Sequence, residues 1–261
     1  MVFIDTHAHL TDRRFSEDFE AVVARAKSAG VVTIINVGYD LPSSEAAIAL
    51  AADNDNFFAA VGIHPHEASS VDQNILQSLK KLAAHPKVVA IGEIGLDYYY
   101  RHSEPKQQEH ALRQQIRLAR ELALPVIIHD RDAHEDVLAI LRAEKAAEVG
   151  GVMHCFSGDL DFALRCLELG FYISFAGTIT FKKPGDLPLV AQKVPLERIL
   201  IETDCPYLAP IPRRGRRNEP AYVVHVAEKI AELRQLELNK IAAITTQNAQ
   251  RLFALTKNIA K

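Results

Sequence analysis

The chain alternates between short apolar runs and longer amphipathic segments along most of its length. The short runs are rich in valine and isoleucine, which is typical of strands buried on both faces of a parallel sheet. Between them, apolar residues recur at helical spacing, and this alternation favours an α/β fold. We expect strands at residues 2–6, 32–37, 57–62, 88–93, 125–129, 150–154, 171–174 and 198–202, and helices at 15–29, 43–53, 71–84, 106–123, 134–147, 159–169, 220–234 and 239–255.

Eight strands separated by helices predict a TIM-like (β/α)8 barrel. The region 175–197 is hard to assign because Pro184 and Pro188 interrupt its pattern. A length of 261 residues suits one barrel domain spanning 1–261, although length alone would also permit two domains. In such barrels the functional residues lie at the carboxyl ends of the strands.

Six potential metal ligands lie at or just beyond the predicted strand ends. Because parallel strands deliver their carboxyl ends to one face, we expect these side chains to gather on a pair of divalent ions. Imidazoles two residues apart in an extended segment project to the same side and suit one ion. The six are His7, His9, Glu93, His129, His154 and Asp204.

The roles of the carboxylates follow from their places in the sequence. Glu93 closes an apolar strand, where a charge is costly unless it is paired or metal-bound, and its two oxygens could bridge two ions. A buried ion pair with an arginine is the alternative. Asp204 could ligate an ion and accept a proton from its water, whereas the alternative, a helix N-cap, is disfavoured by Pro206. His129 or His154 alone would more often be an ordinary buried histidine, whereas for His7 and His9 alone that alternative and metal binding are evenly balanced.

Net charge, cysteine count and the lengths of the apolar runs indicate the cellular compartment and the kinds of partner to expect. A net charge of −3 gives no global basic signature, so contact with nucleic acid must come from local patches. Three cysteines without close pairing argue against a disulfide framework. The start of the chain turns polar too early for a signal peptide, and no apolar run approaches a membrane span. We therefore expect a cytoplasmic protein without membrane contact, and no obligatory protein partner is evident.

Residues that could hold a substrate follow the same strand ends. His64 comes after the third strand and could bond a phosphate or a leaving oxygen, or simply pack its loop around Pro65. Arg131 could clamp a phosphate with its planar guanidinium, or pair with an acid at the start of the next helix. Four tyrosines could stack on a terminal base or pack ordinarily: Tyr98, Tyr99, Tyr100 and Tyr207.

The only dense basic cluster in the sequence is the segment 213–217. It falls in the loop after the eighth strand, where contact with a nucleic-acid backbone is favoured over a merely solvated loop. We select Arg216 from this segment as a substrate contact. Asn218, which follows it, could order the loop or touch the substrate.

Short motifs along the whole chain resemble the signature blocks of the TatD family. They occur in order as Asp5-Thr6-His7-Ala8-His9, Gly62-Ile63-His64-Pro65-His66, Gly92-Glu93-Ile94-Gly95-Leu96-Asp97-Tyr98, Ile128-His129-Asp130-Arg131, His154-Cys155-Phe156-Ser157-Gly158, Glu202-Thr203-Asp204-Cys205-Pro206 and Arg217-Asn218-Glu219-Pro220. The resemblance implies an amidohydrolase-like metal-dependent hydrolase. It also implies His7 and His9 on one ion, His129 and His154 on the other, Glu93 between the ions, and Asp204 as ligand and base. A carbamylated lysine bridges the metals in many relatives of that superfamily, and Glu93 holds its place here.

The activity implied by the resemblance is a metal-dependent deoxyribonuclease that shortens DNA, especially single-stranded ends, from the 3′ side. Two other functions fit the same residues. A metal-dependent ester or amide hydrolase, such as an aminoacyl-tRNA deacylase, would use the same activated water, and a non-catalytic metal-binding scaffold would not need Asp204. Two divalent ions are expected. Imidazoles suit zinc, iron or nickel, whereas carboxylates and phosphate suit magnesium or manganese.

Overall fold

The computed structural model describes residues 1–255, and contacts divide them into two compact units. Unit 1 comprises Met1–Asn36, Cys155–Leu164 and the residues from Ile173 onward. Unit 2 comprises Val37–His154 and Arg165–Tyr172. The single domain expected over 1–261 stays a prediction, and its last six residues lie outside the described part.

All eight predicted strands are present, and their order in the sheet is the order along the chain. The pairs formed within each unit are parallel. Apolar side chains on these strands are almost completely buried, as their continuous apolar runs predict. The strands are β1 Phe3–Ala8, β2 Val31–Val37, β3 Phe57–Val61, β4 Val88–Asp97, β5 Val126–Arg131, β6 Gly151–Met153, β7 Tyr172–Phe175 and β8 Ile199–Ile201.

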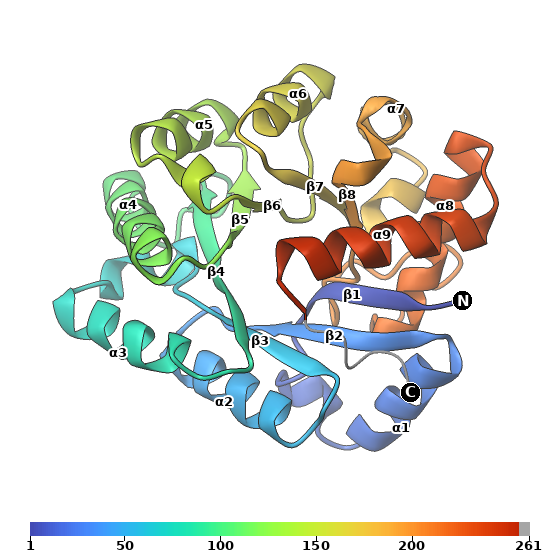
Figure 1. The fold of residues 1–261 in the computed structure, drawn as a ribbon, viewed down its shortest axis with the longest axis horizontal. Helices are drawn as coiled ribbons and strands as arrows, with labels where there is room; N and C mark the ends of the chain where they lie inside the picture. The colour runs from blue at the N-terminus through green and yellow to red at the C-terminus, as the bar shows by residue number, and fades with distance from the viewer. Residues whose placement is uncertain (256–261) are drawn as a thin grey trace. The chain divides into compact units, whose positions relative to one another are not determined.

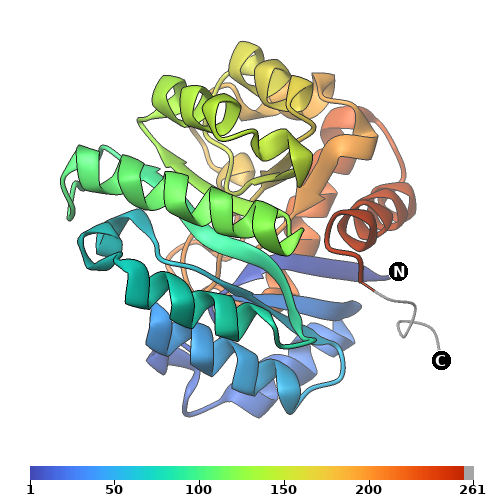
Figure 2. The same ribbon diagram turned by 60° about the vertical axis from the view of Figure 1, so that its left-hand side comes forward.

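The helices also follow the predicted order (Figures 1 and 2). Short 3-10 turns replace the ends of several predicted helices; the segment 144–147, for example, lies beyond the end of its helix. The helices are α1 Phe19–Ser28, α2 Leu41–Ala52, α3 Gln73–Ala83, α4 Pro105–Leu122, α5 His134–Ala143, α6 Leu160–Glu168, α7 Leu187–Lys193, α8 Val223–Arg234 and α9 Leu238–Leu252.

In unit 1, the first and last strands of the chain are tied together. β1 pairs with β2, β7 pairs with β8, and Ala8 forms a bridge with Cys205, just beyond β8. Helix α9 packs against β1 and β8 and lies beside α8 (Figure 1). Residues from the start and from the end of the sequence therefore share one neighbourhood.

Unit 2 is built from the consecutive strands β3 to β6. Helices α2, α3 and α4 lie side by side in chain order, and α4 packs against β4 (Figure 2). A capping box between Glu104 and Gln107 and a proline in the first turn start α4. Every residue of β4 is buried, so this strand forms the core of the unit.

Two elements differ from the sequence prediction for clear physical reasons. Helix α7 forms although Pro188 interrupts the apolar pattern, because this proline lies in the first turn, where its missing N–H costs no hydrogen bond. Strand β4 continues four residues past Glu93, because it keeps pairing with β5 as far as Asp97 and Arg131. Glu93 thus lies inside the strand and not at its end.

Candidate metal centres

The first cluster of potential ligands lies in unit 1. His7 is on β1, His9 follows that strand, and Asp204 follows β8. The Nε2 atoms of the two histidines are 3.1 Å apart, and they lie 3.8 Å and 3.5 Å from Oδ1 of Asp204. Two imidazoles and a carboxylate therefore converge as the sequence predicts.

Backbone contacts bring this first cluster together. The N–H of His9 donates to the carbonyl of Cys205, and the N–H of Asp204 donates to the carbonyl of His7. Asp204 has a φ of 55°, a left-handed conformation that aspartate adopts more readily than most residues. Backbone hydrogen bonds therefore join the segment after β8 directly to the end of β1.

Two buried acids reinforce the segment that carries Asp204. Asp5 accepts hydrogen bonds from the N–H and the hydroxyl of Thr203, at 2.9 Å and 2.6 Å. Burial raises the pKa of Asp5 to about 8, although these hydrogen bonds act in the opposite direction. Glu202 accepts from the N–H of Cys155 and from the hydroxyl of Ser174. These contacts fix the backbone around Asp204 from two sides.

The second cluster lies in unit 2 and is centred on the carboxylate of Glu93. Its Oε1 atom lies 2.7 Å from Nδ1 of His129, 2.9 Å from Nε2 of His154 and 3.6 Å from Nε2 of His64. Glu93 is 4% exposed. Within this unit its charge faces imidazoles, the arrangement expected of a metal-binding carboxylate.

His129 is held between two carboxylates of the same strand. Its Nδ1 atom faces Glu93, and its Nε2 atom lies 3.3 Å from Oδ2 of Asp97. Its partner in the β4–β5 ladder is Gly95, where a Cβ would lie 1.9 Å from the carbonyl oxygen of His129. Glycine is therefore required for the close approach that places the imidazole between Glu93 and Asp97.

The electrostatics of the second cluster follow from this packing. Burial raises the pKa of Glu93, but the facing His154 and His64 and the hydrogen bond from His129 outweigh it, so the pKa is well below its usual value. Burial lowers the pKa of His129, but Asp97 and Glu93 reverse this effect and raise the pKa to about 9. Burial holds the pKa of His64 well below its ordinary value. The cluster therefore stabilises negative charge on Glu93.

Both clusters suit divalent cations by the chemistry of their donors. In each, two imidazole nitrogens and a carboxylate oxygen lie within 4.8 Å of one another, in the groups His7, His9, Asp204 and His64, Glu93, His129. Mixed nitrogen and oxygen donors of this kind bind zinc, manganese or iron. His64, predicted as a substrate contact, is thus also placed as a potential ligand.

Arg131 keeps its guanidinium free of hydrogen bonds and ion pairs with the described residues. The alternative raised by the sequence, a pair with an acid at the start of α5, does not form: Glu135 binds Arg165 instead. The guanidinium of Arg131 lies 5.0 Å from the ring centre of Tyr99. Tyr99 and Tyr100 are 58% and 62% exposed and meet edge to face. A cation beside exposed rings is therefore present in unit 2.

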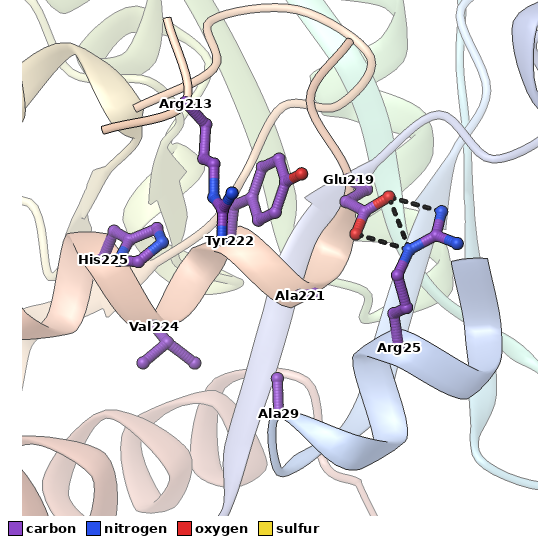
Figure 3. A pocket seen from close by; sticks show the side chains of 8 residues that line it. All are labelled: Arg25, Ala29, Arg213, Glu219, Ala221, Tyr222, Val224 and His225. Carbon is purple, nitrogen blue, oxygen red and sulfur yellow. Dashed lines mark hydrogen bonds and ion pairs between the residues drawn. The ribbon is translucent and has the colours of Figure 1, made fainter. Parts of the chain in front are cut away.

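The basic loop after β8 is held mainly by structural contacts. Arg217 forms a double ion pair with Asp18 at 2.7 Å, and Arg214 lies over the ring of Phe181. Arg213 lines a hollow of about 430 Å³ beside α8, and Figure 3 shows it facing Tyr222. Arg216 is exposed, and its guanidinium forms no hydrogen bond or ion pair with the described residues. Its charge is therefore available to a ligand from solvent.

Asn218 and Glu219 connect this loop to the rest of unit 1. Asn218 is fully buried and donates both amide hydrogens to the backbone, to the carbonyls of Thr203 and Tyr207. Glu219 forms a double ion pair with Arg25 of α1, drawn in Figure 3. Of the two roles suggested by the sequence for Asn218, ordering the loop is the one seen here.

Comparison with known proteins identifies the family of the chain. Residues 4–254 match the family model described as TatD related DNase. The chain belongs to the TatD family. It is 48% identical over 97% of its length to all of an uncharacterized metal-dependent hydrolase, YabD, from Bacillus subtilis (strain 168). It is 40% identical over the same share to 98% of the 3′-5′ ssDNA/RNA exonuclease TatD from Klebsiella pneumoniae (strain 342).

A solved TatD structure supports the fold. The crystal structure of YjjV, a TatD homologue from Escherichia coli K12, superposes with a TM-score of 0.92 at 34% identity, covering 97% of this chain and 98% of that one. The predicted TIM-like (β/α)8 fold is thus confirmed. The protein is a TatD family metal-dependent hydrolase. Within residues 1–255, no helix is both long and apolar enough to cross a bilayer.

Two residues of the second cluster were not selected from the sequence. Asp97 and His66 face each other at 2.8 Å, and Asp97 also contacts His129. Strand periodicity could have revealed Asp97, because residues four apart on a strand point to the same face and Asp97 follows Glu93 by four. The signal was missed because the strand was predicted to end at Glu93.

Proposed function

We propose that this TatD family hydrolase is a divalent-metal-dependent deoxyribonuclease that removes nucleotides from the 3′ end of single-stranded DNA. The observation that carries the proposal is the convergence of imidazoles and a carboxylate in each unit. A relative of 40% identity named as a 3′-5′ ssDNA/RNA exonuclease supports the substrate class and the polarity.

In this proposal each cluster holds one ion. His7, His9 and Asp204 ligate the first, and Glu93, His129 and His154 ligate the second, with His64 beside them. The bridging role of Glu93 stays a prediction of the sequence. Divalent ions bound here would lower the pKa of a water molecule and neutralise phosphate charge. The assay described below tests which of magnesium, manganese and zinc supports the activity.

The chain's own groups supply proton transfer and charge. Asp204 would accept the proton of the attacking water, and its backbone is held for this by the hydrogen bond from its N–H to the carbonyl of His7. Arg131 and Arg216 bind phosphate oxygens, because both keep their guanidinium groups unpaired among the described residues. His64 donates a hydrogen bond to a phosphate or a leaving oxygen. Its low pKa keeps it neutral, so that it acts as a hydrogen-bond donor and not as a charge.

Exposed rings support a preference for single strands. Tyr99 and Tyr100 are more than half exposed, and the guanidinium of Arg131 lies beside the ring of Tyr99. Unpaired bases stack on such rings whatever their sequence, and the nearby cation attracts the backbone. A duplex keeps its bases stacked on one another and gains less from this surface.

The test is degradation of a DNA oligonucleotide labelled at its 5′ end, in EDTA, magnesium, manganese or zinc. Wild type is compared with Glu93→Ala and Asp204→Asn. We expect a ladder that shortens from the 3′ end only with metal, no ladder with Glu93→Ala, and a strongly slowed one with Asp204→Asn. RNA of the same sequence, and the duplex, are the matched substrates.

A metal-loaded protein that leaves DNA and RNA intact would contradict the nuclease proposal. An ester or amide hydrolase, such as an aminoacyl-tRNA deacylase, would then be tested on aminoacyl-tRNA and small esters with the same variants. Metal binding without turnover on any of these substrates would favour the non-catalytic scaffold. The localisation in the cytoplasm and the lack of an obligatory protein partner stay predictions.

A further inference from the structure

Asp97 is a buried carboxylate whose acceptor positions are all engaged within unit 2. Its Oδ2 atom lies 2.8 Å from Nε2 of His66 and 3.3 Å from Nε2 of His129. Its Oδ1 atom accepts from the backbone N–H groups of Tyr99 and Tyr100, at 3.0 Å and 2.8 Å. A carboxylate has about four acceptor sites, so Asp97 is saturated by these contacts.

The backbone of Asp97 is fixed as firmly as its side chain. Gln108 of α4 accepts from the N–H of Asp97 at 2.7 Å and donates to its carbonyl at 3.1 Å. The same amide also donates to the carbonyl of Ser103, whose hydroxyl donates to the carbonyl of His66. Both imidazoles therefore meet a carboxylate that cannot easily turn away.

The two ring nitrogens of His129 have different partners. Nδ1 faces Glu93, the centre of the second cluster, and Nε2 faces Asp97. A histidine that binds a metal with one nitrogen usually donates the proton of the other to a carboxylate or a carbonyl, which fixes the ring and its tautomer. Asp97 stands where such an acceptor is needed.

We propose that Asp97 is a positioning residue that holds the proton of His129 on Nε2 and thereby keeps the Nδ1 lone pair available to a metal ion. The inference rests on the ligand role of His129 in the proposed function but not on the substrate. His66 is the second donor to the same oxygen, and it keeps Oδ2 directed toward His129. Asp97 itself touches neither the ion nor the substrate.

Asp97→Asn tests this role with almost no change in shape. The amide oxygen stays with the N–H groups of Tyr99 and Tyr100, because the amide nitrogen would meet two donors there. The NH2 group then faces His66 and His129 and requires acceptors at both Nε2 atoms. The proton of His129 moves to Nδ1, toward Glu93, and blocks the ligand nitrogen.

The first measurement is zinc binding by calorimetry, without substrate. We expect Asp97→Asn to weaken one of the two zinc sites by about 10- to 100-fold, the usual cost of losing such a partner. Asp130→Asn is the matched control. The side chain of Asp130 is 5% exposed and contacts an imidazole, His134, at 2.7 Å, but neither residue belongs to a ligand cluster. This control should bind zinc as wild type does.

The second measurement is nitrogen NMR of histidine-labelled wild type with zinc, which needs no variant to fold. We expect His129 to carry its proton on Nε2 and none on Nδ1. A proton on Nδ1 in the zinc-loaded protein, or unchanged zinc affinity in Asp97→Asn, would overturn the positioning role alone. Wild type that binds no divalent ion would overturn the metal centres of the proposed function, and the inference with them.

Discussion

The two ligand clusters are held in place by different means. In unit 1, the cluster of His7, His9 and Asp204 depends on backbone hydrogen bonds between the end of β1 and the segment after β8. In unit 2, the cluster around Glu93 depends on side-chain contacts. The carboxylate of Glu93 contacts Nδ1 of His129, and the carboxylate of Asp97 contacts Nε2 of the same ring. One cluster is positioned by chain topology, and the other is positioned by charge.

The buried acids behind the two clusters show the same contrast. Asp5 in unit 1 binds backbone and hydroxyl donors of Thr203, and its pKa is raised because burial dominates. Burial acts in the same direction on Asp97 in unit 2, but hydrogen bonds from His129, the Tyr100 N–H and His66 outweigh it and lower the pKa. Neutralising Asp97 should therefore disturb the second cluster more than neutralising Asp5 disturbs the first.

The largest effect is expected from Glu93→Gln. The carboxylate is the charge around which the histidines of unit 2 are arranged, so its loss should remove the ion of that cluster and all detectable nuclease activity. Metal content after dialysis, measured by atomic emission, should fall by at least about one ion per chain. Full metal content with normal activity would show that charge does not organise this cluster.

Asp204→Asn should have the next largest effect. The amide keeps the shape of the segment after β8 but cannot accept a proton, and general bases contribute about 10²- to 10⁴-fold to a rate. We expect kcat to fall in that range while the ion of the Glu93 cluster is retained. A decrease in kcat of less than about tenfold would place the base elsewhere.

Exposed tyrosines give a third comparison between the units. Tyr99 in unit 2 and Tyr207 in unit 1 each lie beside an arginine, but Arg14 next to Tyr207 is paired with Asp12, whereas Arg131 is unpaired among the described residues. We expect Tyr99→Ala to weaken binding of single-stranded DNA in EDTA by about 1–3 kcal/mol, the usual value of one stacked base. Tyr207→Ala should cost less; fluorescence anisotropy of labelled DNA measures both.

The smallest effect is expected from the two unpaired arginines. Removal of one cation from a phosphate reduces the salt dependence of single-strand binding by about 0.7 in the slope of log K against log salt. Arg131→Gln and Arg216→Gln should each show this decrease. Arg251→Gln removes an exposed charge from α9 and is the control. A slope equal to that of the control would show that the tested arginine does not bind a phosphate.

Much of the fold could be read from the sequence because its strands are continuous apolar runs, and all eight of them form. The six proposed ligands were chosen because each was predicted at or just beyond a strand end, where a barrel exposes side chains, although Glu93 lies inside β4. Helix α7 was not predicted, because apolar periodicity does not distinguish a proline in the first turn of a helix, such as Pro188, from one that interrupts a helix. Arg217 belongs to the basic segment 213–217, but its ion pair with Asp18 depends on the tertiary structure and could not be predicted from the sequence.

The sequence by itself determined the order of the elements and the types of ligand, because burial and periodicity are local properties of the chain. Tertiary structure decided which groups share a proton or a charge, because that depends on distances of a few ångströms between residues far apart in sequence. The sequence held Asp97, Gly95 and His129, but only the pairing of β4 with β5 placed one imidazole between two carboxylates.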